Sequence, residues 1–574
     1  MYDWVLTKFV GNVPEISESL GISPVAARVL CNRRVNTAEL AREYLSPALT
    51  DDDIKDLRET VQIVKKFIAS RERIFVYGDY DADGVTSTVI IYKTLKDLGA
   101  DVFYYIPDRE AEGYGLNMPA IGFVAENGCK LLITVDNGIA AIPEIKRAKE
   151  LGLTVCVIDH HEQGEFLPNA DSIIDPKRRD CASTFKGYCA AGLCYLFAKE
   201  LYKSYNKPNP RESEFLIFAA LATVCDIVPL LGNNRVLVRN GLIELNKKEN
   251  LNIGLQALMD EKSLTEIKEY DIGFIIGPCI NATGRLETAK IAVALFTTDD
   301  REMAAKWAQT LSGLNEERKR LTKLAYEGIL IPDDKVIVIY DEEIHESIAG
   351  IVAGRVKERV NHPAVVLTKS SEEGCAKGSA RSVEGYDIFE ELSKCADLFT
   401  RFGGHPMAAG LSLRTDDIDE LRTRLNENCT LSDFTAKLKI DALLDLSEVN
   451  FALAKELEVL SPFGSGNHKP LFSSLCVSLA SLKLYENKNT IIFTFETDDR
   501  PIKGVCFGAE FIQKLTDIIS ESYPAETEKI LSGVIRNTPI ILDIVYHIEI
   551  NEYKGNYSRE LRIKDFRRHK ERNV

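Results

Sequence analysis

Short apolar runs that alternate with helical patterns constrain the first half of this chain most strongly. Between Phe75 and Pro229, the runs are continuous rather than alternating apolar and polar. Such runs are typical of strands buried on both faces of a parallel sheet, with crossover helices between them. The pattern predicts an α/β, doubly wound domain. The expected strands are residues 74–77, 102–106, 131–135 and 155–158, and two expected helices are residues 86–98 and 140–151.

The rest of the chain divides into regions with different patterns. Residues 242–330 are helical and charged and end in a long helix at 311–330, which indicates a connecting segment. A second α/β unit begins with an expected strand at 335–339. Alternating strands after a polar stretch at 426–432 fit a small β-barrel. The basic end, residues 562–570, is equally typical of a solvated tail and of a nucleic-acid contact. The expected domains are 1–50, 51–241, 242–332, 333–432 and 433–574.

Composition limits the classes of protein that this chain can be. Its 574 residues indicate about three to five domains. No apolar run approaches the roughly 20 residues that span a bilayer, and the start shows no signal peptide. Thirteen cysteines occur without C-x-x-C pairs, which favours reduced thiols and a cytoplasmic location. The net charge of −16 argues against coating of duplex nucleic acid and favours a narrow, directed channel.

Acidic and histidine side chains follow three of the expected strands directly. Because open α/β sheets bind ligands at the carboxyl ends of their strands, these side chains should meet at one edge. A further acidic residue ends a later apolar stretch. The candidates are Asp79, Asp81 and Asp83 after the first strand, Asp136 after the third, Asp159, His160 and His161 after the fourth, and Asp226.

The residue types at this edge indicate a site for two divalent metal ions. Hard cations need oxygen ligands, and manganese also accepts imidazole. Alternate carboxylates in an extended loop, as at Asp79, Asp81 and Asp83, should point to one side, and Asp136 is placed to bridge two ions. Paired ions about 3.5–4 Å apart activate water and stabilise the leaving oxygen of a phosphate ester. One Asp-x-Asp-x-Asp usually caps a helix, but acidic loops at three strand ends favour a metal site.

These motifs resemble those of a known superfamily. The sequences G-D-Y-D-A-D-G, D-N-G, D-H-H and C-D-I-V-P-L are similar to the four signature motifs of the DHH phosphoesterases. Within that superfamily the chain resembles the RecJ exonucleases. The resemblance implies a DHH parallel-sheet domain, a helical connecting segment, a DHH-associated α/β domain and a C-terminal OB-like β-barrel. Further segments that match in order are 281–286, 314–318, 350–355, 378–382, 403–410 and 462–467.

The resemblance also assigns roles at the acidic edge. It implies Mn²⁺ or Mg²⁺ as two bound ions and Asp159 as a partner that orients His160. His161 would contact the scissile phosphate or the attacking water. The implied metal ligands are Asp81, Asp83, Asp136, His160 and Asp226, with Asp79 completing the shell of the second ion.

Other residues are expected to hold the substrate. By pattern alone, Arg109 is more often a surface ion pair and His405 is equally a core histidine. The resemblance implies instead that both bind substrate, and that Ser379 and Arg381 grip a 5′-terminal phosphate. Most barrel aromatics are core residues, and the others suit base stacking. The implied substrate-binding residues are Arg109, Arg285, Ser379, Arg381, Gly403, Gly404 and His405.

The function implied is a single-strand-specific 5′→3′ DNA exonuclease that releases 5′-mononucleotides, in DNA repair and recombination. The alternative is a DHH phosphodiesterase of short oligonucleotides or cyclic dinucleotides, which generally has only the two α/β domains. A non-catalytic scaffold would have lost metal ligands, and a pyrophosphatase needs no barrel. Single-stranded DNA is the expected partner, with a single-strand-binding protein and a helicase as candidates and no membrane.

Overall fold

The computed structural model describes residues 2–50, 52–109, 112–113, 115–497, 500–533, 540–553 and 555–570. The chain forms two compact units. One is Leu49–Thr435, and the other joins Met1–Ala48 to Ala436–Val574. In the described part of the chain, no helix is both long and apolar enough to cross a membrane.

A five-stranded, fully parallel sheet lies at the centre of the first part of Leu49–Thr435. Its order is β3-β2-β4-β5-β6, which confirms the doubly wound prediction. The strands β2, β4 and β5 are buried on both faces as expected, whereas β3 is half-exposed because it lies at the edge. The bounds are β2 Ile74–Tyr77, β3 Val102–Tyr105, β4 Leu131–Val135, β5 Thr154–Ile158 and β6 Ser172–Ile174.

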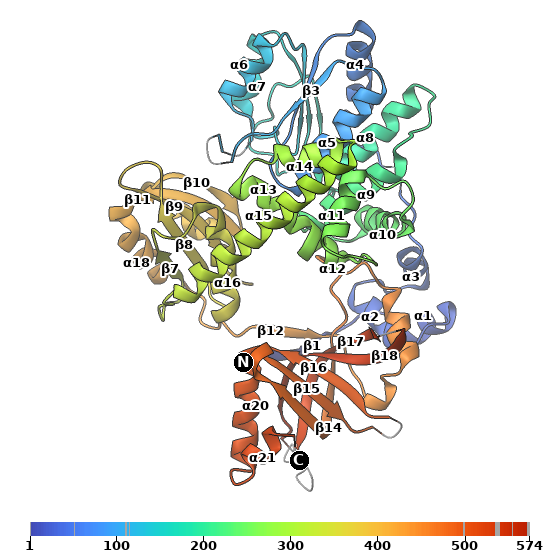
Figure 1. Cartoon of the computed structure of the whole chain (residues 1–574), viewed down its shortest axis with the longest axis vertical. Helices are drawn as coiled ribbons and strands as arrows, with labels where there is room; N and C mark the ends of the chain where they lie inside the picture. The colour runs from blue at the N-terminus through green and yellow to red at the C-terminus, as the bar shows by residue number, and fades with distance from the viewer. Residues whose placement is uncertain are drawn as a thin grey trace. The chain divides into compact units, whose positions relative to one another are not determined.

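Helices cover both faces of this sheet (Figure 1). Phe75 and Tyr77 of β2 pack toward α6 and α7, and Ile74 and Val76 pack toward α4, α5 and α8. The chain runs from β2 outward to β3 and then returns to β4 on the other side of β2. The order of strands therefore reverses beside β2, where such sheets bind ligands. The helices are α4 Leu57–Ser70, α5 Ala82–Asp97, α6 Met118–Glu126, α7 Ile142–Glu150 and α8 Ala190–Ser204.

The expected helical connecting segment is confirmed. Its long helix, α15, begins at Arg301 rather than at residue 311, because the Asp300 side chain accepts hydrogen bonds from the amides of Glu302 and Met303. A π-helical turn, Ile272–Ile276, leads into α13. The helices α9 Glu212–Cys225 and α10 Gly232–Lys247 lead into this segment, and the segment itself contains α11 Ile253–Glu261, α12 Glu269–Asp271, α13 Gly277–Leu286, α14 Lys290–Thr297 and α15 Arg301–Gly328.

The second α/β region has a mixed five-stranded sheet of order β10-β11-β9-β8-β7. Only β7 and β8 run parallel. The helix α16 packs on one face with the end of α15, and α17 and α18 pack on the other. The bounds are β7 Ile337–Tyr340, β8 Ala364–Lys369, β9 Cys375–Arg381, β10 Phe399–His405, β11 Ala408–Arg414, α16 Ala349–Val360, α17 Ile388–Ser393 and α18 Ile418–Asn428.

The other unit contains the expected barrel. Its strands follow the order β13-β14-β15-β16-β18-β17, and pairing of β14 with β17 closes the sheet. The predicted basic tail is wrong, because residues 562–568 lie in β18. The strands are β12 Lys437–Ile440, β13 Ala442–Leu443, β14 Phe472–Tyr485, β15 Thr490–Phe495, β16 Ile502–Phe507, β17 Ile541–Tyr553 and β18 Asn556–Arg568, and the helices are α19 Phe451–Glu458, α20 Ala509–Ser522 and α21 Thr527–Leu531.

Residues 1–48 share the core of the barrel. The strand β1 (Asp3–Leu6) pairs in parallel with β12, and Ile16, Leu30 and Ala41 are buried in the same cluster as Phe493. The helices are α1 Val13–Leu20, α2 Pro24–Asn32 and α3 Ala38–Leu45. The sequence placed residues 1–50 in a segment of their own, whereas the structure places them in the compact unit of residues 436–574. The exact domain boundaries stay predictions.

Candidate active site

The acidic loop after β2 is not extended, as the sequence suggested, but enters α5 at once. Asp81 caps the helix: its Oδ1 accepts hydrogen bonds from the amides of Asp83 at 2.9 Å and Gly84 at 3.0 Å. A Cβ atom on Gly84 would lie 2.5 Å from the carbonyl oxygen of Asp79. Glycine therefore lets the first helical turn lie directly on the loop, which gathers the three carboxylates.

Asp83 is anchored at the start of another helix. Its two carboxylate oxygens accept hydrogen bonds from the amides of Ala190 and Ala191 at the N-terminus of α8, both at 2.7 Å. The positive end of a helix stabilises a carboxylate there. This side chain is fully buried, so its position is fixed by the packing of α5 on α8.

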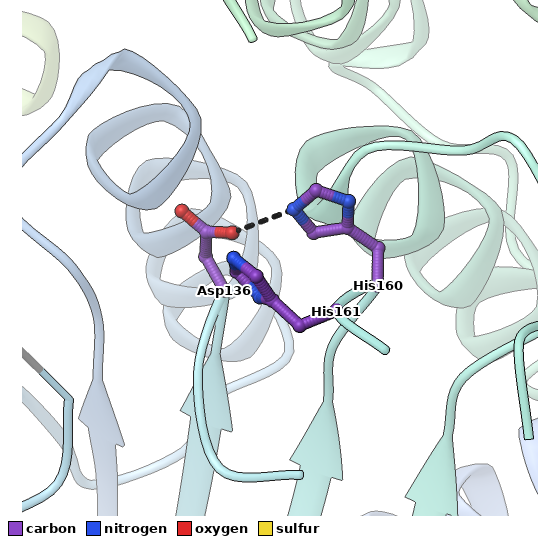
Figure 2. Close-up of side chains that lie close together, drawn as sticks. All are labelled: Asp136, His160 and His161. Atoms are coloured by element: carbon purple, nitrogen blue, oxygen red, sulfur yellow. Dashed lines mark hydrogen bonds and ion pairs between the residues drawn. The ribbon is translucent and has the colours of Figure 1, made fainter. Parts of the chain in front are cut away.

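Asp136 follows β4 in a left-handed backbone conformation, with a φ of 62°. Such a conformation is uncommon for residues other than glycine and is often found at functional sites. It brings the Asp136 Oδ1 within 3.1 Å of the Nε2 of His160, which follows β5 (Figure 2). The same Nε2 lies 3.6 Å from Asp83 and 3.7 Å from Asp226, which ends α9.

The candidate metal ligands form two groups that meet at Asp136. Ligand atoms of Asp79, Asp81 and Asp136 lie within 4.8 Å of one another, and so do those of Asp83, His160 and Asp226. Asp136 is also grouped with His160 and His161. All six expected ligands are therefore brought together, from the ends of three strands (β2, β4 and β5) and two helices (α5 and α9). The position of Asp136 between the groups fits the expected bridge between two ions.

The electrostatics of this cluster fit bound cations. Burial, followed by repulsion from neighbouring carboxylates, raises the pKa of Asp79 and Asp136 well above the usual range. The same causes raise the pKa of Asp83 to about 7 and of Asp226 to about 8. Burial and then the nearby His161 lower the pKa of His160 to about 3, which keeps its imidazole neutral.

Two buried atoms of the cluster have no hydrogen-bond partner within the described residues. They are Oδ1 of Asp79 and Nδ1 of His160. Buried polar atoms without a partner are costly, and a crowd of buried carboxylates repels itself. Carboxylates with one neutral imidazole are a donor set that suits Mn²⁺, and carboxylates alone suit Mg²⁺. The residues therefore fit the two expected cations.

Asp159 orients the ring of His161 rather than that of His160, contrary to expectation. Its Oδ1 lies 2.7 Å from Nδ1 of His161 and accepts a hydrogen bond from the backbone amide of His160 at 2.7 Å. Residues two apart at a strand end point to the same side, which explains the pairing. Burial alone would raise the pKa of Asp159, but the contact with His161 holds it well below its usual range. Burial likewise opposes the charge on His161, and Asp159 still raises its pKa to about 9.

The expected phosphate-binding arginines also cluster. The guanidinium of Arg109 lies 5.1 Å above the ring of Tyr80, and Nη1 of Arg285 donates to the carbonyl of Ser347 at 2.7 Å. Burial, followed by repulsion from Arg109, Arg318 and Arg381, lowers the pKa of Arg285 to about 10. Across the described ranges, none of these four arginines forms an ion pair with a carboxylate. The four, named here the arginine cluster, are Arg109, Arg285, Arg318 and Arg381.

Strand register places the DHH-associated motifs on one face of the second sheet. Arg381 of β9 pairs with Ala408 of β11, which pairs with His405 of β10. In the same way, Ser379 pairs with Gly410, which pairs with Gly403. Directly paired residues share a face, so Ser379, Arg381, Gly403 and His405 lie on one side. Gly404 occupies the alternate position. No hydrogen bond or ion pair among the described residues joins the exposed Gly403–His405 to the arginine cluster.

Three residues of the site were not singled out from the sequence. Tyr80 lies under Arg109, and Arg318 adds a charge beside Arg285. Asn281 of α13 accepts a hydrogen bond from the amide of Ala82 at 2.8 Å, which ties α13 to the acidic loop. All three lie inside motifs that match the RecJ family, so the sequence could have drawn attention to them. Their roles were missed because each depends on a contact with a residue from a distant element.

Comparisons with known proteins identify the family. Family models match at residues 73–223 (DHH family, N-terminal domain), 333–430 (DHHA1 domain) and 440–565 (RecJ OB domain). The "Single-stranded-DNA-specific exonuclease RecJ" of Bacillus subtilis is 36% identical over 96% of this chain and 69% of its own length. The chain belongs to the RecJ family.

Solved structures of the family share the fold over the whole chain. RecJ from Thermus thermophilus in complex with Mn²⁺ superposes with a TM-score of 0.83 at 27% identity, over 99% of this chain and 80% of that one. The structure of the same protein with Mg²⁺ gives a TM-score of 0.77 at 25% identity, over 99% and 78%. The RecJ likeness inferred from the motifs is confirmed, as is the four-part fold class.

Replacing Asp136 by asparagine should abolish hydrolysis while leaving the fold intact. The change removes the charge between the two ligand groups, so both cation positions are lost together. Because it also relieves repulsion among buried carboxylates, the metal-free variant should unfold at the same or a higher temperature. Exonuclease assays and thermal unfolding measure the two effects. Activity within about tenfold of the wild type, roughly 1.4 kcal/mol in barrier, would contradict the assignment. Asp101→Asn, at an exposed ion pair, is the control.

Replacing Asp159 by asparagine should lower the pKa of His161. The carboxylate stabilises the protonated ring, and asparagine removes that charge while keeping the shape. NMR titration of the ring in the metal-free protein should show a decrease of about one unit or more. Asp171→Asn, whose carboxylate pairs with Lys149, should leave the titration unchanged. An unchanged pKa in Asp159→Asn would show that the contact does not hold the proton.

Proposed function

We propose that this chain degrades single-stranded DNA from the 5′ end and releases 5′-mononucleotides. The arginine cluster beside the carboxylate cluster carries this proposal. Arg109 links the two, because it lies over Tyr80 and offsets part of the rise in the pKa of Asp79 that burial and Asp81 cause. Guanidinium groups that form no ion pair with a carboxylate among the described residues suit a polyanion, and a crowd of buried carboxylates suits metal ions. A phosphodiester substrate with two cations satisfies both.

The residues of the acidic edge divide the chemistry between them. Bound at the two ligand groups, Mn²⁺ or Mg²⁺ would activate water and stabilise the leaving oxygen. Asp159 accepts a hydrogen bond from Nδ1 of His161 and raises its pKa to about 9, so the ring carries both protons and its Nε2–H can donate to a phosphate oxygen. The neutral His160 and the shared Asp136 are ligands in this account. Burial of the cluster strengthens each of these electrostatic contacts.

In this proposal the arginine cluster determines that digestion starts from the 5′ end of the strand. Arginine contacts to phosphate fix the strand without reading its bases, which suits an exonuclease of low sequence preference. Ser379 and Arg381 lie two residues apart on β9, and both side chains point to the face covered by α16. A terminal phosphate held there would place the first internal phosphodiester at the acidic edge.

Replacing Arg381 by alanine should selectively weaken the use of strands that begin with a 5′ phosphate. A charge-assisted contact worth about 1.5–3 kcal/mol is lost, roughly ten- to a hundredfold in affinity. Lysine should restore little, because it lacks the planar fork. The measurement compares kcat/KM on two strands that differ only in that phosphate. An equal loss on both strands, or products from the 3′ end, would favour the short-oligonucleotide phosphodiesterase instead.

The barrel would hold the strand beyond the active site. Of the six aromatic residues considered from the sequence, Phe472, Phe493 and Phe495 are fully buried. Tyr485 and Phe507 are exposed, and the guanidinium of Arg562 lies 4.4 Å from the Phe507 ring. Exposed aromatic rings beside arginine are typical of single-strand binding by such barrels. The remaining residue, Phe463, is half-buried.

Removing the barrel unit should weaken binding of long strands and spare cleavage of short ones. Because residues 1–48 share the barrel core, the test compares the full chain with residues 49–435, which keep their own cores. The readouts are KM and kcat on strands of several lengths. Equal losses on a short oligonucleotide and a long strand would remove the strand-holding role. Tyr485→Ala with Phe507→Ala in the full chain is the finer variant.

The expected partner proteins and cellular role are part of the same proposal. A single-strand-binding protein and a helicase would supply the substrate, one by holding the strand and one by unwinding duplex. DNA repair and recombination are the processes that consume such resected ends. The RecJ OB domain at residues 440–565 supports single-stranded DNA as the common ligand. Pull-down from purified components with and without DNA tests each protein partner.

A further inference from the structure

Gly350, near the start of α16, lies against the guanidinium of Arg381. A Cβ atom built on Gly350 would lie 2.8 Å from Nη2 of Arg381 and 3.2 Å from Oγ of Ser379. The first distance is shorter than real Cβ contacts, and the second is tighter than most of them. Both side chains expected to hold the terminal phosphate therefore occupy the space that any larger residue at position 350 would fill.

The backbone around Arg381 has little freedom to retreat from such a contact. The strand β9 is interior to its sheet, and Arg381 pairs with Ala364 on one side and Ala408 on the other. The Nη1 of Arg381 donates to the carbonyl of Ala380 at 2.9 Å, and no carboxylate in the described ranges forms an ion pair with this guanidinium. An added methyl group at position 350 would thus displace the guanidinium, which is the far end of a flexible side chain, rather than the strand.

We infer that Gly350 is a positioning residue that sets the place of the Arg381 guanidinium and thereby selects strands with a terminal 5′ phosphate. This rests on the proposed function. A terminal phosphate carries about −1.5 to −2 charges, more than an internal diester. A planar guanidinium distinguishes it only when both of its donors reach the phosphate oxygens, so small displacements matter. Gly350 acts through Arg381 and touches no reacting atom.

The same helix provides a matched control. Gly354 lies one turn further along α16, and a Cβ atom there would meet no heavy atom within 4 Å. Alanine at either position replaces a glycine that lies within α16. Only the variant at position 350 introduces a contact with Arg381.

The test measures kcat/KM for two single strands that differ only in the 5′ phosphate, in Gly350→Ala, Gly354→Ala, Arg381→Ala and the double variant. The ratio of the two values is the readout. We expect Arg381→Ala to lower this ratio about ten- to a hundredfold. Gly350→Ala should lower the same ratio by at least half as much on a logarithmic scale, mainly because KM for the phosphorylated strand increases. Gly354→Ala should keep the wild-type ratio. The double variant should match Arg381→Ala, because the clash needs the arginine.

The outcomes separate this inference from the function on which it rests. An unchanged ratio in Arg381→Ala would overturn the phosphate pocket itself. A reduced ratio in Arg381→Ala with a wild-type ratio in Gly350→Ala would overturn only the role of Gly350. If the double variant lowers the ratio by the sum of the two single losses on a logarithmic scale, the role of Gly350 is likewise overturned. Thermal unfolding guards against misfolding: a defect of Gly350→Ala that comes from the clash should disappear in the double variant, and a defect that persists there contradicts the inference.

Discussion

The repulsion among buried carboxylates at the carboxyl edge of the first sheet is the constraint on which the site depends. Asp79, Asp83, Asp136 and Asp226 come from four different positions in the fold, and burial together with their neighbours raises the pKa of each. Without bound cations, these carboxylates repel one another in the folded chain. Hydrogen bonds from the α8 amides to Asp83 and the left-handed backbone of Asp136 keep them in place. Divalent cations convert the same repulsion into binding energy.

The arginine cluster is the complementary constraint. The chain as a whole carries a net charge of −16, yet three arginines gather around Arg285, and none of the four forms an ion pair with a carboxylate in the described ranges. The carboxylates and the arginine cluster therefore lie near each other, and Arg109 offsets only part of the rise in the pKa of Asp79. In the proposed function a phosphodiester strand would satisfy both, because cations and guanidinium groups each bind phosphate oxygens.

Much of the first sheet and its acidic edge could be predicted from sequence. Strands buried on both faces leave long apolar runs, and parallel strands bring their carboxyl ends together, so Asp136 and His160 were expected side by side. The acidic loop was expected to be extended, whereas Asp81 takes the usual capping role of such a motif and accepts a hydrogen bond from the Gly84 amide, so α5 begins there. The partner of Asp159 was also missed, since it depends on which side each residue faces after the strand ends.

Long-range features were harder to predict. The pairing of β1 with β12 joins segments more than 400 residues apart, and neither strand carries a signal that names its partner. The contact of Gly350 with Arg381 likewise depends on how α16 crosses β9, which no local pattern fixes. The segments that contain Gly350 and Arg381, residues 350–355 and 378–382, were visible in the sequence as matches to the RecJ family. Their physical roles needed the packing of elements that are distant in the chain.

The shared position of Asp136 is the central claim, and the stoichiometry of cation binding tests it most directly. Calorimetric titration of the intact, metal-free protein with Mn²⁺ should give two ions per chain, with release of protons because the pKa values of the carboxylates are raised. Asp136→Asn should lose high-affinity binding of both ions at once. Two ions retained by Asp136→Asn, or a single site in the wild type, would contradict the account.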